Sequence, residues 1–149
     1  MQQPGIHTIL APTDFSEGAA RALAWARTLA QTFRAEIVVL HVLEVPVNWT
    51  PLGGLGSIPT PLSPESVEQL ASEAQTIVET VAQDAPEVSR RLLRKGHPRE
   101  VILAMVREVG ADVVVMGTHG RRGVSHLLIG SVAEHVVRHS PVPVCTVRE

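Results

Sequence analysis

The residues best suited to bind a ligand lie in one stretch near the carboxyl end of the sequence, from Gly117 to Ser131. Glycine permits positive φ angles and lets a backbone approach a bulky anion closely. Successive backbone N–H groups in such a turn form a concavity that binds anions. Gly130-Ser131 stands at the start of a predicted helix, whose unpaired N–H groups and dipole favour phosphate. The stretch therefore predicts a phosphate-binding loop.

This stretch differs from the two most familiar phosphate-binding motifs. The sequence contains no Gly-x4-Gly-Lys-Ser/Thr motif, and no Gly-x-Gly-x-x-Gly follows its first predicted strand. For any single glycine a plain structural role is the better explanation, with Gly117 and Gly120 turning the chain and Gly130 making an irregular helix start. The whole set, gathered at one place in the fold, favours a binding site.

Other side chains capable of chemistry are scattered along the sequence. His135 and His139, at i and i+4, have a spacing that suits a metal, but no third ligand stands near them, so zinc is not expected. Arg121 and Arg122 suit phosphate contact and a solvated loop about equally. Asp14 is a candidate ligand contact, a helix cap, or both.

No nucleophile and base converge on the glycine stretch. Cys145 stands among aliphatic residues and is expected to be a small buried hydrophobe. His41 lies in a predicted strand and is expected to be a hydrogen-bonded core residue. The pattern therefore predicts no catalytic residues, and rapid catalysis is not expected.

The elements that must position these residues alternate along the chain. Short aliphatic runs are typical of strands buried on both faces, while apolar residues at i, i+3 and i+4 are typical of helices. The predicted strands are Ile6–Ala11, Glu36–Val42, Val88–Lys95, Val113–Met116 and Val142–Val147, and the predicted helices are Ser16–Phe33, Pro64–Val81, Pro98–Val109 and Ser131–Arg138.

The order of the strands follows from their edges. Charged residues in the third strand and Pro143 in the fifth place both strands at the sheet's edges. With right-handed crossovers, the simplest arrangement is a single doubly wound, five-stranded parallel sheet of order 3-2-1-4-5, with helices on both faces, a Rossmann-like α/β fold. Ligands of such sheets bind where the order reverses, at the carboxyl ends of the strands. Here those ends are Pro12-Thr13-Asp14 and Met116-Gly117-Thr118.

Composition excludes several classes of protein. The 149 residues are 44% hydrophobic and 3% aromatic, with a net charge of −2 and one cysteine, which suits one globular domain in a reducing, cytoplasmic setting. The lack of a basic excess argues against nucleic acid as a partner. No apolar run reaches the roughly 18 residues that span a bilayer, so no membrane contact is expected.

One segment interrupts the alternation of strands and helices. Residues 46–62 contain four prolines and three glycines, which disfavour regular structure, and they are predicted to form a flexible Pro/Gly-rich loop. Trp49 and Leu52 are the residues expected to pack this loop against the body of the protein.

Three separate motifs resemble those of the universal stress protein family. The spacing Gly117-x2-Gly120-x9-Gly130-Ser131 is similar to the family's ATP-binding signature. Residues 9–16, with the sequence Ile-Leu-Ala-Pro-Thr-Asp-Phe-Ser, resemble the family's first strand and turn, and Leu40-His41-Val42 and residues 140–144 resemble later segments. The resemblance covers the chain except for residues 46–62.

The resemblance implies a role for each matching position. Asp14 would meet the adenosine, with Pro12, Thr13 and Val42 lining the adenine pocket, Met116 and Gly117 along the ribose, and Gly120, Gly130, Ser131 and Val132 around the phosphates. His126 stands where family members often carry a basic residue. The implied ligand is ATP with Mg²⁺, and no residue of the chain is assigned as a metal ligand.

The resemblance also implies a stress-response regulatory module that binds ATP and acts on a protein partner. The short, aliphatic edge strand Val142–Val147 is the expected seam of a homodimer, and dimerisation is implied by the resemblance too. The alternatives are a slow ATPase or nucleotide hydrolase using the same pocket, and an adaptor whose nucleotide site is vestigial.

Overall fold

Five parallel strands form the central sheet of the computed structural model, which describes residues 5–119 and 129–148. They are β1 (Thr8–Pro12), β2 (Glu36–Leu43), β5 (Val88–Lys95), β6 (Val113–Gly117) and β7 (Val144–Val147). Their order is β5-β2-β1-β6-β7, and each neighbouring pair is parallel. The predicted order and fold class are confirmed, because the aliphatic runs are indeed buried on both faces.

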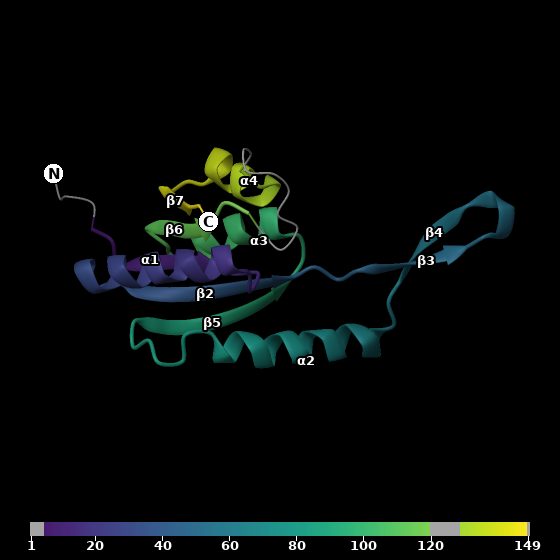
Figure 1. Ribbon diagram of the computed structural model, residues 1–149, viewed down its shortest axis with the longest axis horizontal. Coiled ribbons are helices and arrows are strands. Elements are labelled where there is room, and N and C mark those ends of the chain that lie inside the picture. The colour runs from purple at the N-terminus through teal and green to yellow at the C-terminus, as the bar shows by residue number, and fades with distance from the viewer. Residues whose placement is uncertain (1–4, 120–128, 149) are drawn as a thin grey trace.

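Two helices cover each face of this sheet (Figure 1). The helices α1 (Glu17–Phe33) and α2 (Pro64–Thr80) pack on one face, and α3 (Pro98–Val109) and α4 (Ser131–His139) pack on the other. Alternation along β1 divides the core, since Ile9 belongs to the cluster under α1 and Leu10 to the cluster under α3 and α4. Both side chains are fully buried.

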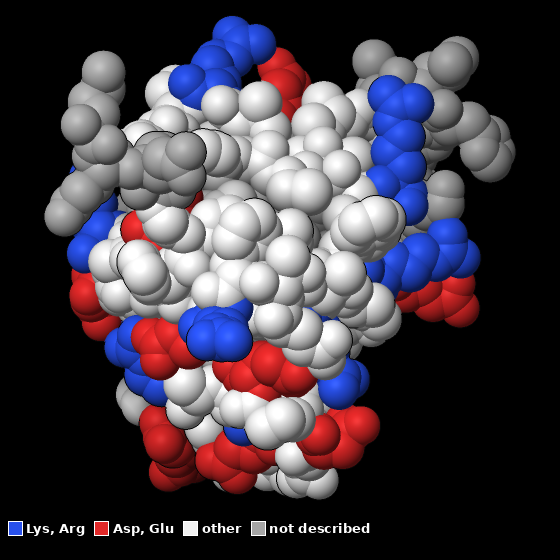
Figure 2. Space-filling model, turned by 90° about the vertical axis from the view of Figure 1, so that its left-hand side faces the viewer, with Lys and Arg blue, Asp and Glu red and all other residues white. Residues whose placement is uncertain are grey.

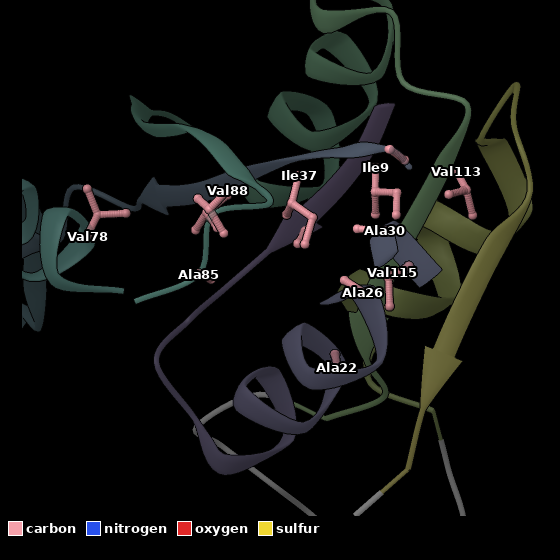
Figure 3. Close-up of a cluster of buried hydrophobic side chains, with 13 residues drawn as sticks. Ile9, Ala22, Ala26, Ala30, Ile37, Val78, Ala85, Val88, Val113 and Val115 are labelled. Carbon is pink, nitrogen blue, oxygen red and sulfur yellow. The ribbon is translucent and has the colours of Figure 1, made fainter. Parts of the chain in front are cut away.

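The close packing of α1 depends on its small residues (Figure 3). Ala22, Ala26 and Ala30 face Ile9 and the rest of the first cluster, each with 1% exposure or less. Phe33, the last residue of α1, is not part of this buried stripe, because its side chain is 49% exposed. A stripe of alanines lets the helix approach the sheet more closely than large side chains would.

The helices begin and end where their capping residues predict. Ser16 accepts a hydrogen bond from the Ala19 N–H at 3.2 Å, and Ser63 accepts one from Ser66 at the same distance. Gly110 ends α3 in the left-handed conformation, with φ 66°.

The two outer strands of the sheet are β5 and β7, as predicted. Arg90, Arg94 and Lys95 on β5 pair with carboxylates at 3.4, 3.0 and 3.6 Å, which suits a solvated edge. Mixed acidic and basic side chains also cover the lower part of the molecule in Figure 2. The opposite edge, β7, follows Pro143 and carries only Val, Cys and Thr.

Residues 46–62 contain a regular antiparallel hairpin, so the prediction of a segment without regular elements is wrong. The strands β3 (Val47–Pro51) and β4 (Ser57–Pro61) pair around a short 3-10 turn, η1 (Gly53–Leu55). Gly56, at φ 95°, accepts a hydrogen bond from Leu52 at 2.7 Å and closes that turn. The hairpin projects away from the sheet and its helices (Figure 1), and Trp49 and Leu52 are 65% and 46% exposed rather than packed down.

No helix within residues 5–119 and 129–148 combines the length and the apolar character that a membrane span requires.

Candidate functional site

The order of the strands reverses between β1 and β6, which lie side by side in the sheet. The chain leaves β1 toward α1 on one face, and it leaves β6 toward α4 on the other. Doubly wound sheets bind ligands in a crevice at the carboxyl ends of the two strands, between such departures. The candidate site is therefore built from the turn after β1 and the segments that flank α4.

The turn after β1 is held by its own polar side chains. Thr13 N–H donates to the Leu40 carbonyl at 2.8 Å, which extends the pairing with β2 by one residue. Thr13 Oγ1 then accepts from the Phe15 N–H at 3.1 Å, and Asp14 Oδ1 accepts from the Ser16 N–H at 3.0 Å. Asp14 is not the cap of α1, because Ser16 holds that position. Its carboxylate instead shapes the turn that leads into the helix.

A ring pair fixes this turn from the α1 side. Phe15 adopts φ 64°, a conformation that costs energy for a bulky residue, and its ring lies 4.3 Å from the His41 ring between centroids. His41 Nδ1 is 2.8 Å from the Thr13 carbonyl, and because a carbonyl only accepts, Nδ1 is the donor. The predicted hydrogen bonding of His41 is confirmed, but the residue is only partly buried rather than part of the core. Sequence reasoning missed the role of Phe15, since nothing in the sequence indicates a positive φ there.

Gly117, the last residue of β6, lies directly against the backbone of α1's first turn. A Cβ atom at this position would be 3.0 Å from the Gly18 carbonyl carbon and 3.3 Å from the Ala19 nitrogen. Both neighbours are backbone atoms, so a side chain would force the helix and strand apart. The glycine thus has a packing role, and it brings the ends of β1 and β6 together through α1.

Gly130 makes a second close approach, at the start of α4. Its N–H donates to the Thr118 carbonyl at 2.6 Å, and a Cβ would lie 2.8 Å from that same oxygen. With φ −61° the backbone conformation suits any residue, so space alone requires glycine. Thr118 is buried, and its N–H donates to the Val147 carbonyl at 3.0 Å. The N-terminus of α4 is therefore anchored to the carboxyl ends of β6 and β7.

This N-terminus carries no side-chain cap, because the capping residue is Gly130. The first N–H groups of an α-helix have no partner within the helix. Ser131, the first helical residue, is exposed. The arrangement presents hydrogen-bond donors and the positive end of the helix dipole at the crevice, an arrangement suited to an anion.

The apolar residues of the predicted site share the face of the sheet that α3 and α4 cover. Val42 and Val132 pack against the second core cluster, and Met116, 6% exposed, belongs to it. Pro12 ends β1 in the same alternation as Leu10, so it lies on that face as well. Gly120 is outside the described residues, as are Arg121, Arg122 and His126.

A separate hollow of about 340 Å³ lies on the α1 side of the turn. It shares Thr13, Phe15 and Ser16 with that turn, but it also involves Arg27 of α1 and the residues after α2. Arg27 is already paired with Glu87 at 3.7 Å. Val42, Met116 and Val132 do not line this hollow, which is therefore distinct from the predicted site.

His135 and His139 on α4 form a stacked pair rather than an open metal site. Their rings lie 4.2 Å apart, and His139 Nδ1 donates to the His135 carbonyl at 2.9 Å. Among residues 5–119 and 129–148, no three His, Cys, Asp or Glu side chains are grouped to hold a metal ion.

Acidification is expected to destabilise the protein through His135. Desolvation lowers the pKa of this imidazole below the ordinary histidine value, and the nearby positive charges of His139, Arg99 and His97 lower it further, against a small opposing effect of Glu100. The unfolded chain then binds the proton more tightly than the native state. His135 therefore does not reduce the free energy of unfolding above a pH of about 6.5, where the imidazole is neutral in both states. As the pH falls from there through the lowered pKa of the native state, the free energy of unfolding decreases.

Melting temperatures measured across this pH window test the expectation. His135→Gln should flatten the decline, because it removes the group whose pKa is lowered in the native state. Equal slopes for the parent and His135→Gln would contradict the assignment.

Comparison with known proteins gives one consistent result. The model described as the universal stress protein family matches residues 5–148. A universal stress protein from Thermus aquaticus is 34% identical over 142 residues, which cover 95% of this chain and 98% of that protein. The solved structure of UspA from Lactobacillus plantarum has a TM-score of 0.78 at 25% identity and covers 98% of this chain and 100% of its own.

Two further solved structures share the fold at 22% identity. One is a universal stress protein in complex with cAMP, with a TM-score of 0.61 over 97% of this chain and 98% of that chain. The other, from Archaeoglobus fulgidus, is in complex with dAMP, with a TM-score of 0.60 over 97% of this chain and 99% of that chain.

Proposed function

Because this chain belongs to the universal stress protein family, we propose that it binds an adenine nucleotide at the carboxyl edge of the sheet and acts as a regulatory module in a stress response. The observation that carries the proposal is the anchoring of α4, whose uncapped N-terminus is held at the strand reversal by the 2.6 Å bond from Gly130 to Thr118. A phosphate group is the ligand chemistry that such a terminus favours.

The adenosine half of the ligand would lie along the apolar side of the crevice. Pro12, Val42 and Met116 share one face there, and they offer aliphatic walls without aromatic stacking. Thr13 and Asp14 stand at the end of β1 in a turn fixed by hydrogen bonds, and the Asp14 carboxylate would meet the adenosine. A hydrogen-bonding group beside an apolar slot is the usual composition of a small-molecule site.

The phosphate half would lie against the start of α4. Gly117 and Gly130 keep the backbones close, and Ser131 and Val132 begin the helix whose dipole faces the anion. Gly120 completes the family's motif. ATP is the proposed ligand, and Mg²⁺ would be carried by its phosphates, as this ion prefers phosphate oxygens and water.

The two relatives solved with cAMP and dAMP support adenine recognition as the common element. Both ligands contain an adenine and a single phosphate. Titrating this chain with ATP, AMP and cAMP in parallel ranks them, and the proposal expects ATP to bind most tightly because its three phosphates reach the N-terminus of α4.

We further propose that two copies associate through β7. This strand is an outer strand with neither charged residues nor a proline within Val144–Val147, so its free edge lacks the usual protection against pairing. Nucleotide binding at the neighbouring crevice would then alter the surface that the dimer presents to a protein partner.

Asp14→Asn tests the adenosine contact without breaking the turn. Asn keeps an oxygen that accepts from the Ser16 N–H, but it removes the negative charge. ATP at 100 times its Kd should raise the parent's melting temperature by roughly 5 to 10 °C. We expect Asp14→Asn to retain the ligand-free melting temperature and to bind ATP at least about tenfold more weakly, since it loses a charge-assisted hydrogen bond.

A measurement of ATP turnover by the purified protein distinguishes a nucleotide-binding module from an enzyme. The proposal expects at most slow release of phosphate. Robust multiple turnover that Asp14→Ala abolishes would show instead that the same pocket belongs to an ATPase or nucleotide hydrolase. An adaptor with a vestigial site is indicated if neither ligand-induced stabilisation nor turnover is measured.

A further inference from the structure

The β3–β4 hairpin, here called the arm (residues 45–62), exposes apolar side chains well away from the core (Figure 1). Trp49 is 65% exposed, Leu55 is 89% exposed, and Val47 and Ile58 are each nearly half exposed. An isolated two-stranded hairpin is marginally stable in water and normally needs a third strand or a packing surface. The arm therefore has the composition of an element that is completed by another chain.

The two faces of the arm differ in character. Side chains of directly paired residues lie on the same face of a sheet, and they alternate along each strand. One face carries the cross-strand pairs Val47–Pro61 and Trp49–Pro59, and the other carries Asn48–Thr60 and Thr50–Ile58. A 2.7 Å hydrogen bond joins the Thr50 and Thr60 hydroxyls on the second face. The first face is apolar and is the one with Trp49.

Prolines determine which backbone groups of the arm point outward. Pro59 and Pro61 lie opposite Trp49 and Val47, and a proline cannot donate a ladder hydrogen bond. The bonds between β3 and β4 must therefore pass through the alternate pairs, because bonded and non-bonded pairs alternate in an antiparallel ladder. The backbone groups of Val47 and Trp49 consequently point away from β4, toward the outer edge of β3.

The two outer edges of the arm are not equivalent. On β4 two of the three outward positions, 59 and 61, are prolines, which offer no N–H to a further strand, and only Ser57 beside the turn offers one. On β3 the outward residues Val47 and Trp49 offer both an N–H and a carbonyl, and only Pro51 at the end of the strand lacks an N–H. The β4 edge is therefore closed to pairing along most of its length, and the β3 edge is open at its two consecutive outward residues.

Charge also distinguishes the β3 edge. Natural sheets protect outer strands with charged side chains, as Arg90, Arg94 and Lys95 do on β5. Residues 45–64 contain no charged residue, in contrast to the mixed charges on the face in Figure 2. Two identical arms can therefore lie side by side without like-charge repulsion.

We propose that β3 pairs antiparallel with β3 of a second copy of this chain, about a two-fold axis that passes through Asn48. Within Val47–Pro51, this register pairs both residues whose N–H and carbonyl groups point outward. Val47 then lies opposite Trp49 of the other copy, and Trp49 lies opposite Val47 of the other copy. Shifting the axis to residue 49 would place Val47 opposite Pro51, which lacks an N–H. The interface is self-complementary, as a two-fold contact requires.

The pairing would stop at two copies. It forms a four-stranded sheet in which the two β3 strands are central and the two β4 strands are outermost. The prolines of β4 block further strands at both outer edges. On the apolar face, each Trp49 would gain a cross-strand contact with Val47 of the other copy, the kind of pair that stabilises sheets.

A single cysteine at the proposed axis tests this register. In an antiparallel non-bonded pair the two Cα atoms are about 4.5 Å apart, a separation that a disulfide accommodates. In a Cys145→Ala background, Asn48→Cys is expected to form a covalent dimer under mild oxidation. Ser57→Cys, on β4 near the tip, serves as the matched control and should remain monomeric on a non-reducing gel. Equal cross-linking of the two variants would overturn the proposal.

The mass of the particle in solution gives a second, independent test. Val47→Pro removes an outward N–H from the β3 edge, whereas Ser57→Pro removes the one outward N–H of the β4 edge. Loss of two ladder bonds per interface should weaken association roughly 10- to 100-fold. By light scattering, Val47→Pro should have a lower mass than the parent and Ser57→Pro, whether or not the chains also associate through β7. Equal masses for the parent and Val47→Pro would overturn the proposal.

Discussion

Gly130→Glu is expected to abolish ATP binding while leaving most of the fold intact. The substitution places a carboxylate at the N-terminus of α4, where the proposed ligand has its phosphates. Like charges at close range cost several kcal/mol, so binding should weaken by at least about 100-fold. The new Cβ would also lie 2.8 Å from the Thr118 carbonyl and displace the start of the helix. Calorimetric titration with ATP measures the loss.

Two further variants separate the charge from the displacement. Gly130→Ala introduces only the close contact, so we expect a smaller loss of binding than for Gly130→Glu. Gly110→Ala destabilises the protein by a different route, since Gly110 has φ 66° in open space at the end of α3. It should lower the melting temperature and retain the shift induced by ATP. Binding by Gly130→Glu within threefold of the parent would refute the position of the phosphates.

Gly117→Val is expected to destabilise the whole domain. Its Cβ would meet the Gly18 carbonyl carbon at 3.0 Å and the Ala19 nitrogen at 3.3 Å, and neither backbone atom can move without shifting α1. Overpacking of this kind costs about 1 to 3 kcal/mol, which corresponds to a fall of roughly 3 to 10 °C in melting temperature. Since the same contact brings the turn after β1 to the end of β6, ATP binding should weaken as well.

Gly54→Val is the matched control for this effect. Gly54 lies in the turn of the arm, and a Cβ there would meet nothing within 4 Å. Thermal unfolding followed by circular dichroism should give a melting temperature close to that of the parent. If Gly117→Val melts at the parent's temperature, the close approach of β6 to α1 does not constrain the site as described.

The architecture of the sheet was predictable because its signals are local. Arginines in the third predicted strand and Pro143 before the last one identify the outer strands, and aliphatic runs identify the central ones. Serine and proline at the start of α2 and glycine at the end of α3 place those helix ends to within a residue. Each signal reports a property of one segment, so tertiary context does not override it.

The arm was not predictable by the same reasoning. Proline in a sequence normally indicates a break in regular structure. Pro59 and Pro61, however, lie at positions where the β3–β4 ladder requires no backbone N–H donor. That register becomes visible only once the partner of each residue is known. The exposure of Trp49 has the same origin, because a large apolar residue in a sequence is normally taken to be buried.

The candidate site was predictable in outline and less so in detail. Topology and the glycine spacing indicate the strand reversal, but the reason for two of the glycines lies in distant backbone. A side chain at Gly117 would collide with the backbone of Gly18, and a side chain at Gly130 would collide with the Thr118 carbonyl oxygen. The interaction of Phe15 with His41 likewise joins two segments that are far apart in sequence and side by side in the fold. Contacts of this kind carry no local signature.

The outer edges of β7 and β3 are the two strand edges proposed to pair with a second copy of the chain. The β5 edge is charged and prolines close most of the β4 edge, whereas β7 has neither protection and β3 has only Pro51 at its end. Pairing at β7 would join the bodies of two chains, and pairing at β3 would join two arms. Since the arm directly follows β2, which carries Val42 of the proposed adenine pocket, an arm contact would lie close in sequence to the nucleotide site.

The measurement that tests the central claim most directly is a calorimetric titration of the unmodified protein with Mg²⁺-ATP, repeated with Asp14→Asn. The account predicts saturable binding with one nucleotide per chain, at least about tenfold weaker in the variant, since one charge-assisted hydrogen bond is lost. The account is contradicted if millimolar ATP gives no measurable heat and no change in melting temperature, because any ligand that binds the native state must stabilise that state.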